Sequence, residues 1–448
     1  MSMKYERVSV YGLGYVGLTL CAAWSRAGYK VLGVDVLEEK IKALNAGLMT
    51  HVEPGVCTEI NRAVSAGRFN ATSDGIYASK HSDIKLISVP VGLDSEGFPI
   101  LESLVAAVKA LAEGLKTGDV VVLESSVPPT TTLNLVMPML EEASGLKAEE
   151  DFYLAYSPER IYVGRALEDL EERYPRIVGG VGTKSSEIVG RLYSKIATKG
   201  VRIVSSPTVA EFEKLAEGVY RDVNIALANE LAILTSRAGI EYDEMAEVAN
   251  SQPFCHLHKP GIGVGGGCIP VYPRFLINLA GSLGTSMDLT DTARRINLVM
   301  PSHTARLVMQ VAFKIGKESP KLAVLGLAFR GGIDDTRFSP TYDLVNALVK
   351  SGIEEITIND PYVSEDTFLK ELGFRLTKRL DEALRGADIV VIATDHPQYE
   401  DLNLQDLKEK THRKRIGVVD GRHIVKDWRN PPKGVVYVGI GRPSQSNL

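Results

Sequence analysis

The chain has 448 residues, of which 44% are hydrophobic and 24% are charged, and its formal net charge is −5. This balance is typical of a globular protein of roughly two or three domains, and it excludes intrinsically disordered, collagen-like and disulfide-scaffold proteins. The acidic net charge and the lack of a long apolar run predict a cytoplasmic protein that binds neither nucleic acid nor a membrane.

The first 200 or so residues alternate short β-branched runs with amphipathic segments. The predicted strands are residues 8–11, 30–36, 84–89, 119–124 and 152–156, and the predicted helices include residues 17–26, 37–46 and 101–115. Strands that alternate with helices indicate βαβ units. We therefore predict a parallel, doubly wound α/β domain at residues 1–203.

A glycine motif follows the first predicted strand and opens the first predicted helix: Gly12, Leu13, Gly14, Tyr15, Val16 and Gly17. In this G-x-G-x-x-G pattern the glycines permit a tight turn and a close approach of the backbone to a pyrophosphate, which the helix N-terminus attracts. Asp35 ends the next strand, where an acid accepts the adenosine ribose hydroxyls. No Arg follows Asp35 directly, although Lys40 lies close in sequence, so the pattern predicts an NAD site rather than an NADP site.

A long helical pattern crosses the middle of the chain. It opens with a capping box, Thr208-x-x-Glu211, and continues to a break at Gly239. A helix of this length typically bridges domains or forms a dimer interface. We predict a central helical dimerisation region at residues 204–317, and hence a homodimer.

The α/β alternation then resumes. Predicted strands lie at residues 322–327, 356–358, 389–393, 417–419 and 435–438. They indicate a second, smaller α/β domain at residues 318–448. The predicted fold is therefore two Rossmann-like doubly wound domains joined by a long central helix.

Cys268 follows a segment, residues 261–267, in which five of seven residues are glycine. Such a loop turns tightly or lets another group approach closely, and a thiol presented by it is a candidate nucleophile. Cys21 and Cys57 lack such a context and are expected to be inert. Cys255, His256 and His258 offer only three neighbouring metal ligands and no second cluster, so no metal site is predicted.

Motifs spread along the chain are similar to those of one protein family: residues 12–17, 53–55, 124–131, 157–160, 263–270, 326–330, 335–340, 387–394 and 440–442. In this order they resemble the UDP-glucose/GDP-mannose dehydrogenase family over nearly the whole chain. The resemblance implies an NAD-binding domain, a dimerising central helix and a C-terminal domain that binds the nucleotide of a UDP-sugar.

The resemblance also implies the chemistry, which is two successive hydride transfers to NAD that convert the sugar CH₂OH into a carboxylate. Cys268 would attack the C6 aldehyde, and oxidation of the thiohemiacetal would give a thioester. Glu159 would activate the water that hydrolyses it, and Lys214 would stabilise the oxyanions. Ser126 stands where the family has a Thr hydroxyl near the reacting centre and the cofactor.

Further contacts follow from the same resemblance. Arg330 would meet the UDP phosphates and Arg337 the NAD pyrophosphate. The expected cofactor-binding residues are Gly12, Gly14, Tyr15, Val16, Gly17, Asp35, Lys40, Ser126, Cys268 and Arg337. The expected substrate-binding residues are Glu159, Arg160, Lys214, Lys259, Gly263, Gly265, Phe329, Arg330 and Arg422.

The sequence departs from the family pattern at positions close to the chemistry. Gly218 replaces an Asn, Tyr272 replaces an Asp and Val163 replaces an acid, and residues 250–254 lack an expected Arg, for which Lys259 or His258 is a candidate substitute. These losses predict slower turnover unless Tyr272, Arg221 or Asn224 substitutes. They also leave open a relative that binds nucleotide sugars with little or no oxidation activity.

The favoured reaction is the conversion of UDP-glucose into UDP-glucuronate, because residues 330–332 and 336–340 look like glucose-type members. The alternative is a UDP-N-acetylmannosamine or UDP-N-acetylglucosamine 6-dehydrogenase, which the stretch at residues 268–271 resembles. A single-step hydroxy-acid dehydrogenase explains neither the Cys268 loop nor the second α/β domain.

Overall fold

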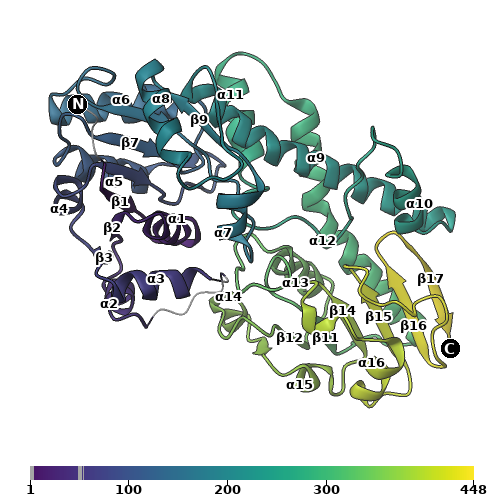
Figure 1. The fold of residues 1–448 in the computed structure, drawn as a ribbon. Coiled ribbons are helices and arrows are strands. Elements are labelled where there is room, and N and C mark those ends of the chain that lie inside the picture. Colours follow the sequence, from purple (N-terminus) through teal and green to yellow (C-terminus); the bar gives the residue numbers. More distant parts are fainter. Residues whose placement is uncertain (1–4, 49–52, 54) are drawn as a thin grey trace. The chain divides into compact units, whose positions relative to one another are not determined.

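The computed structural model describes residues 5–48, 53 and 55–448, which form two compact units (Figure 1). Unit 1 comprises Met1–Glu217 and Arg274–Thr285, and unit 2 comprises Gly218–Pro273 and Ser286–Leu448. The returning segment of unit 1 is held there by the Asn278 side chain, whose Nδ2 donates to the Gly97 carbonyl at 2.8 Å. The chain therefore passes between the units three times.

Unit 1 contains an eight-stranded sheet with the order β10-β9-β8-β7-β4-β1-β2-β3. Its strands are β1 Arg7–Tyr11, β2 Lys30–Val34, β3 Phe69–Thr72, β4 Ile84–Ile87, β7 Val120–Leu123, β8 Tyr153–Tyr156, β9 Arg176–Gly180 and β10 Val201–Ile203. Neighbouring strands are parallel except β8 and β9, which are antiparallel. The five predicted strands, which correspond to β1, β2, β4, β7 and β8, are parallel as expected. The sequence analysis did not predict β3, β9 and β10, and of these β9 runs antiparallel to its neighbour β8.

Helices cover both faces of this sheet. They are α1 Tyr15–Arg26, α2 Glu38–Asn45, α3 Val56–Ser65, α4 Gly75–Lys80, α5 Glu102–Ala112, α6 Met137–Ser144, α7 Ala166–Glu168 and α8 Thr183–Tyr193. Unit 1 also contains two π-helical turns, η1 Thr132–Val136 and η2 Asp169–Arg173, and a small hairpin of β5 Gly92–Leu93 and β6 Pro99–Ile100. Val120 and Val122 of β7 enter the core with α1 and α8, whereas Val121 and Leu123 enter the core with α5 and α6. Both faces are buried, so such strands read as continuous apolar runs.

Unit 2 contains a seven-stranded sheet with the order β13-β12-β11-β14-β15-β16-β17, in which only the last pair is antiparallel. The strands are β11 Leu322–Leu325, β12 Ile356–Asn359, β13 Arg375–Thr377, β14 Ile389–Ile392, β15 Ile416–Asp420, β16 Val435–Gly439 and β17 Arg442–Asn447. The accompanying helices are α10 Tyr242–Ala249, α12 Asp288–Ile315, α13 Pro340–Lys350, α14 Thr367–Glu371, α15 Leu380–Leu384, η3 Pro397–Tyr399 and α16 Leu404–Thr411. A Cβ on Gly417 of β15 would lie 2.0 Å from Val311 of α12, so glycine permits this close packing.

Two helices contain residues of both units. The long helix α9 spans Pro207–Ala238, which confirms the predicted central helix, and α11 spans Tyr272–Ser282. The fold class is therefore confirmed as two Rossmann-like α/β sheets with a long central helix. The domain limits 1–203, 204–317 and 318–448 stay a prediction.

The predicted capping box of α9 is wrong. The helix begins at Pro207, and the Ser206 hydroxyl accepts the Val209 N–H at 3.3 Å. Pro is favoured in the first turn because its missing N–H has no helical partner there. Glu211 instead accepts the backbone N–H groups of Thr130 and Thr132 at 2.6 and 2.8 Å, so its carboxylate caps the π-helical turn η1.

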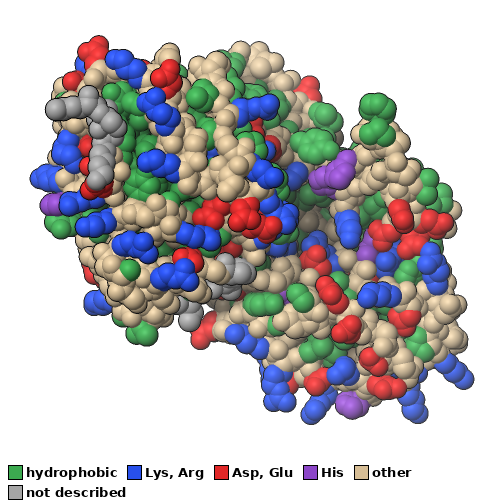
Figure 2. Space-filling model, viewed as in Figure 1, with side chains coloured by type: hydrophobic (Ala, Val, Ile, Leu, Met, Phe, Trp, Pro, Cys, Tyr) green, Lys and Arg blue, Asp and Glu red, His purple; other side chains and the backbone are tan. Residues whose placement is uncertain are grey.

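Among the described helices, none has the length and apolarity that crossing a bilayer requires. Lys and Arg side chains are interspersed with Asp and Glu on the face of each unit that Figure 2 shows.

The predicted strands at residues 30–36 and 84–89 end earlier than expected, at Val34 and Ile87, where the chain turns into the loops that carry Asp35 and Ser88.

Candidate functional site

The glycine fingerprint of unit 1 lies at the carboxyl end of β1. Gly12 has φ +91°, and a Cβ there would lie 2.3 Å from the Ser88 carbonyl oxygen, while a Cβ on Gly17 would lie 1.8 Å from the Gly12 carbonyl oxygen. Both positions therefore need glycine for packing. A Cβ on Gly14 meets nothing within 4 Å. Gly14 thus opens free space in front of α1, whose first residues are Tyr15 and Val16, as a bound pyrophosphate requires.

Asp35 directly follows β2 and lies at the same edge of the sheet. Its Oδ2 accepts the Leu13 N–H at 3.0 Å and the Lys40 ammonium at 3.0 Å, and its Oδ1 accepts the Leu37 N–H at 3.1 Å. Burial alone would raise the pKa of Asp35, but Lys40 and these N–H groups outweigh it and lower that pKa. The carboxylate is thus ionised and fixed beside the fingerprint, which fits a dinucleotide whose ribose hydroxyls donate to it.

Glu159 and Lys214 form a buried ion pair in unit 1. Glu159 follows β8 after Ser157 and Pro158, and the Lys214 ammonium on α9 lies 3.1 Å from Glu159 Oε1 and also donates to the Glu159 carbonyl. Burial would raise the pKa of Glu159, but Lys214 and the Ile161 N–H outweigh it and lower the pKa. An ionised carboxylate held in this way can accept a proton from water.

Ser126 follows β7, three residues after Leu123, and is half-buried. Because β7 and β8 are adjacent parallel strands, the segments that carry Ser126 and Glu159 leave the same edge of the sheet. This edge is also where the fingerprint and Asp35 lie. The structure therefore gathers the predicted residues of unit 1 at the carboxyl ends of its parallel strands.

Arg160, a predicted substrate-binding residue, points to acidic side chains of α9 instead of pairing with Glu159. Its guanidinium lies 2.9 Å from Glu217 and 4.0 Å from Glu213. Burial and the neighbouring Glu217 raise the pKa of Glu213 to about 7. This acidic pair was not predicted, although Glu213 and Glu217 are four residues apart in the sequence and flank Lys214.

Cys268 lies in unit 2, with an exposed side chain, four residues before the first residue of α11. Its carbonyl accepts the N–H groups of Val271 and Tyr272, each at 3.0 Å. The preceding glycines pack on other loops of unit 2: a Cβ on Gly265 would lie 2.6 Å from Phe329, and a Cβ on Gly263 would lie 2.7 Å from Pro340. The glycine-rich loop is therefore fixed to the loops that follow β11.

The predicted arginines of unit 2 lie beside this glycine-rich loop or follow the same strand ends. Arg337 pairs with Asp335 at 2.6 Å, and its Nη1 lies 3.2 Å from where a Cβ on Gly267 would stand. Arg422, which follows β15, pairs with Asp395 at 2.7 Å and lies equally near Gly261. Arg330 follows β11 and is half-buried, whereas Lys259 is exposed. Arg337 thus neighbours the predicted nucleophile, whereas the fingerprint it was assigned to lies in unit 1.

Two of the departures from the family pattern contact one another. A Cβ on Gly218 of α9 would lie 2.5 Å from Cδ2 of Tyr272 and 3.2 Å from its Cβ and Cγ. Tyr272 is buried, with 3% of its surface exposed. The Tyr272 ring therefore occupies the space that a side chain at position 218 would fill.

Asn224 and the histidines near Cys255 have structural contacts. The Asn224 amide donates to the His256 carbonyl at 2.7 Å and accepts the His258 N–H at 2.9 Å.

In the part of the chain that the structure describes, no group of three His, Cys, Asp or Glu side chains is placed to hold a metal ion. Cys21 is fully buried, and burial raises the pKa of its thiol, whereas Cys57 is half-buried.

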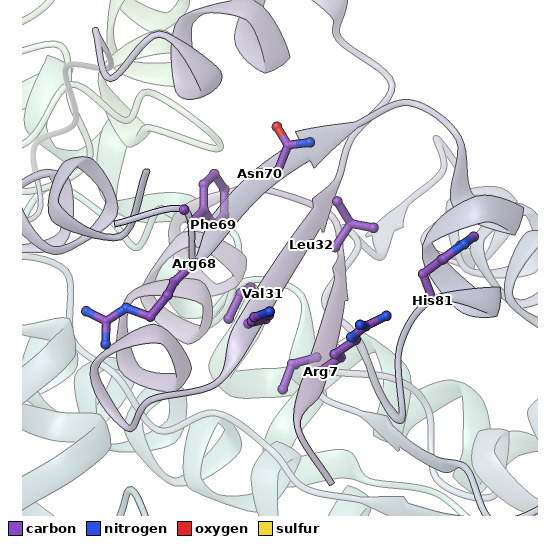
Figure 3. Close-up of a pocket in the computed structure, with 10 residues that line it drawn as sticks. Arg7, Val31, Leu32, Arg68, Phe69, Asn70 and His81 are labelled. Atoms are coloured by element: carbon purple, nitrogen blue, oxygen red, sulfur yellow. The ribbon is translucent and has the colours of Figure 1, made fainter. Parts of the chain in front are cut away.

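A separate groove of about 360 Å³ lies at the amino ends of β1, β2 and β3 (Figure 3). Arg7, Arg68 and His81 line it together with Leu32 and Phe69. Ligands of open α/β sheets bind outside the carboxyl ends of the strands. The groove lies at the opposite edge from the fingerprint, and no predicted site residue lines it.

Comparisons with known proteins agree with this arrangement. Residues 6–197 match the NAD binding domain of the UDP-glucose/GDP-mannose dehydrogenase family, residues 208–298 match its central domain, and residues 323–427 match its UDP binding domain. These matches cover the fingerprint, the α9 helix with the Cys268 loop, and the loops after β11 in turn.

Relatives match over almost their full length. UDP-N-acetyl-D-mannosamine dehydrogenase of Pyrococcus horikoshii is 37% identical over 440 residues, which are 97% of this chain and 99% of that protein. The solved structure of the P. horikoshii UDP-D-ManNAc dehydrogenase covers 97% of this chain and 99% of its own, with 36% identity and a TM-score of 0.88. A UDP-glucose dehydrogenase structure from the hyperthermophilic archaeon Pyrobaculum islandicum covers 98% and 99%, with 28% identity and a TM-score of 0.85.

The family match extends through all three domains, and each contains residues that the resemblance assigned to the cofactor or the substrate. The NAD-binding domain has the fingerprint and Asp35, and the other two have the Cys268 loop and the strand-end arginines. The chain therefore belongs to the UDP-glucose/GDP-mannose dehydrogenase family and is an NAD-dependent UDP-sugar dehydrogenase.

Proposed function

We propose that this protein oxidises C6 of UDP-N-acetyl-D-mannosamine to a carboxylate. The observation that supports the oxidation is Cys268, an exposed thiol on a loop that packs against Phe329 and Pro340 of the UDP binding domain. The choice of sugar follows the relatives, because identity is higher to the N-acetylmannosamine enzyme than to the UDP-glucose enzyme. They thus favour the N-acetylhexosamine alternative over the UDP-glucose interpretation.

NAD, when bound, accepts the hydride that leaves C6 in each of two oxidations. Gly12, Gly14 and Gly17 would hold its pyrophosphate and Asp35 its ribose. Lys214 and Ser126 would donate hydrogen bonds to the C6 oxygen, and the Lys214 charge would stabilise negative charge that develops there. These roles stay predictions for each named residue.

Cys268 would carry the sugar between the two oxidations. Its Sγ bonds to C6 of the aldehyde while the aldehyde oxygen gains a proton, and the product is a thiohemiacetal. Loss of hydride from C6 and of the hydroxyl proton gives the thioester. Glu159 then takes a proton from water as that water attacks C6, the C–S bond breaks, and the electron pair returns to sulfur.

We also propose that two copies of the chain associate through α9. Large apolar side chains of this helix are exposed at Phe212, Tyr220, Leu227 and Leu234, with exposed fractions between 44% and 63%. Their spacing of seven or eight residues places them on one helix face. A second copy would bury this face, and light scattering of the purified protein should give the mass of a dimer. A monomeric mass would contradict the proposal.

The predicted cytoplasmic location stays a prediction.

The test of the reaction is NADH release with UDP-N-acetylmannosamine, UDP-N-acetylglucosamine, UDP-glucose and UDP-galactose compared side by side. We expect two NADH per sugar, with the highest kcat/KM for UDP-N-acetylmannosamine. A higher value for UDP-glucose would contradict the choice of sugar. No NADH from any of them, despite binding of UDP, would favour the alternative that Gly218 and Tyr272 mark a relative without oxidation activity.

The role of the thiol is tested by Cys268→Ser, with Cys255→Ser as the matched control in the same unit. We expect Cys268→Ser to bind UDP-sugar with unchanged affinity and to lose the second oxidation, because a serine hydroxyl is a far weaker nucleophile than a thiolate. Cys255→Ser should keep its activity. Full turnover by Cys268→Ser would refute the covalent mechanism.

A further inference from the structure

One buried guanidinium links the ends of several strands in unit 1. Arg176 opens β9, and 4% of its side chain is exposed. Its Nη2 lies 2.6 Å from Glu124 Oε2, and the same nitrogen donates to the Ser157 hydroxyl at 2.8 Å and to the Ser157 carbonyl at 3.1 Å. The Tyr193 hydroxyl of α8 donates to the other Glu124 oxygen.

These contacts meet at the edge where the candidate site lies. Glu124 directly follows β7, and Ser157 directly follows β8. Ser157 also donates its backbone N–H to the Leu123 carbonyl and its hydroxyl to the Ile177 carbonyl. Only Pro158 separates Ser157 from Glu159. Holding the Ser157 carbonyl therefore fixes the peptide bond that leads into Pro158, whose ring fixes φ before Glu159.

Stability alone does not account for this arrangement. A buried ion pair loses hydration, and apolar residues of similar volume are often as stable or more so. In addition, Arg176 Nε has no hydrogen-bond partner among the described residues, and an unpaired buried donor costs roughly 1–3 kcal/mol. What the guanidinium supplies is a fixed geometry, because one planar group contacts both Glu124 and Ser157.

We infer that Arg176 is a positioning residue, anchored by Glu124, which holds Glu159 in place for hydrolysis of the thioester. The inference rests on the proposed function. In that step water adds its oxygen to C6, Glu159 takes the proton and the C6–S bond breaks, with no change in oxidation state. A base displaced by about 1 Å loses up to roughly 100-fold in rate. Displacement of Glu159 would thus slow the last step while the earlier oxidations continue.

The sheet of unit 1 offers a matched control. Lys85 of β4 and Asp119, which precedes β7, form a second buried ion pair with an N–O distance of 2.7 Å and side chains 0% and 4% exposed. This pair lies at the amino ends of the strands, the opposite edge from Glu159. Lys85→Gln/Asp119→Asn therefore removes a comparable ion pair from the same sheet without touching the candidate site.

The experiment compares Arg176→Lys and Glu124→Gln/Arg176→Gln with that control and with the unsubstituted protein. We expect both Arg176 variants to lose about 10- to 100-fold in kcat, with a similar fall in KM for UDP-sugar, because the slowed step follows formation of the covalent intermediate. Intact-protein mass spectrometry should show a sugar adduct on Cys268 that accumulates during turnover. The control should show neither effect, even if its melting temperature falls.

Three outcomes would overturn the inference. Arg176 variants as active as the control would show that Glu159 needs no such support. Equal losses in all variants without an adduct would show a structural role only. Absence of NADH from the unsubstituted protein would refute the proposed function, and the role of Arg176 in hydrolysis with it. The first two outcomes leave the proposed function standing, so the failures are distinguishable.

Discussion

Gly218→Ala should destabilise the protein although it places a better helix former inside α9. Ala is favoured over Gly in a helix interior by about 1 kcal/mol. The new Cβ would, however, stand 2.5 Å from Cδ2 of Tyr272. Carbon atoms prefer separations of about 3.5–4.0 Å, so the ring would have to move by roughly 1 Å or more. Tyr272 is buried, and its N–H is bonded to the Cys268 carbonyl, so the ring has little room to move.

The two effects can be weighed. Overpacking of a buried site costs about 1–3 kcal/mol, so after the gain in helix propensity we expect a net loss near 1 kcal/mol. In a unit of this size that lowers the melting temperature by roughly 2–4 °C. The matched control is Gly281→Ala in α11, where an added Cβ meets nothing within 4 Å. It should leave the melting temperature unchanged or raise it.

Thermal unfolding followed by circular dichroism measures both variants. Gly218→Ala/Tyr272→Ala should lose less stability than the sum of its single variants, because the smaller side chain leaves space for the new methyl group. If Gly218→Ala raises the melting temperature as much as Gly281→Ala does, Tyr272 moves freely. Gly218 and Tyr272 would then not be energetically coupled.

Two other predictions follow from the geometry of unit 1. Gly14→Ala should fold with an unchanged melting temperature and raise the KM for NAD about 10-fold or more, since its methyl group enters the space left for the pyrophosphate. Gly17→Ala should instead lower the melting temperature, because its Cβ would lie 1.8 Å from the Gly12 carbonyl oxygen. Equal melting temperatures and equal KM values for the two variants would contradict this prediction. Burial beside Glu217 raises the pKa of Glu213 to about 7. The folded state therefore binds more protons than the unfolded state between about pH 4.5 and 7. The contribution of Glu213 to stability falls as pH rises through that window. Glu213→Gln should therefore raise the melting temperature at pH 8 relative to the unsubstituted protein but not at pH 4.5, and a pH-independent difference would refute the assignment.

Local sequence patterns predicted the parts of the site that are formed by residues close together in the sequence. The Gly12–Gly17 turn follows from one strand, one turn and one helix, and Asp35 ends the neighbouring strand. Hydrophobic runs also located the strands that pair as β1, β2, β4, β7 and β8. They did not locate the antiparallel strand β9, because Ile177 and Val178 are its only two large apolar residues and two glycines follow them.

Local sequence patterns could not predict contacts between residues that are far apart in the chain. The Thr208-x-x-Glu211 spacing suggested that Glu211 caps its own helix, yet Thr130 and Thr132, some 80 residues earlier, take its carboxylate. The Gly218–Tyr272 contact joins residues that appeared as independent departures. Glu124 and Arg176 had a faint signal, since each is a charge placed directly at the end of an apolar strand.

The return of Arg274–Thr285 to unit 1 has a consequence for the order in which the protein can fold during synthesis. An N-terminal domain usually completes its fold while later segments are still being translated. Here Asn278, which donates to the Gly97 carbonyl in the turn between β5 and β6, is made long after the hairpin that it contacts. At about 5–20 residues per second, the ribosome needs roughly 3–14 seconds to proceed from Glu217 to Thr285. During that interval unit 1 lacks its final segment, so a nascent chain that stops at residue 217 should be more sensitive to protease than one that extends beyond residue 285.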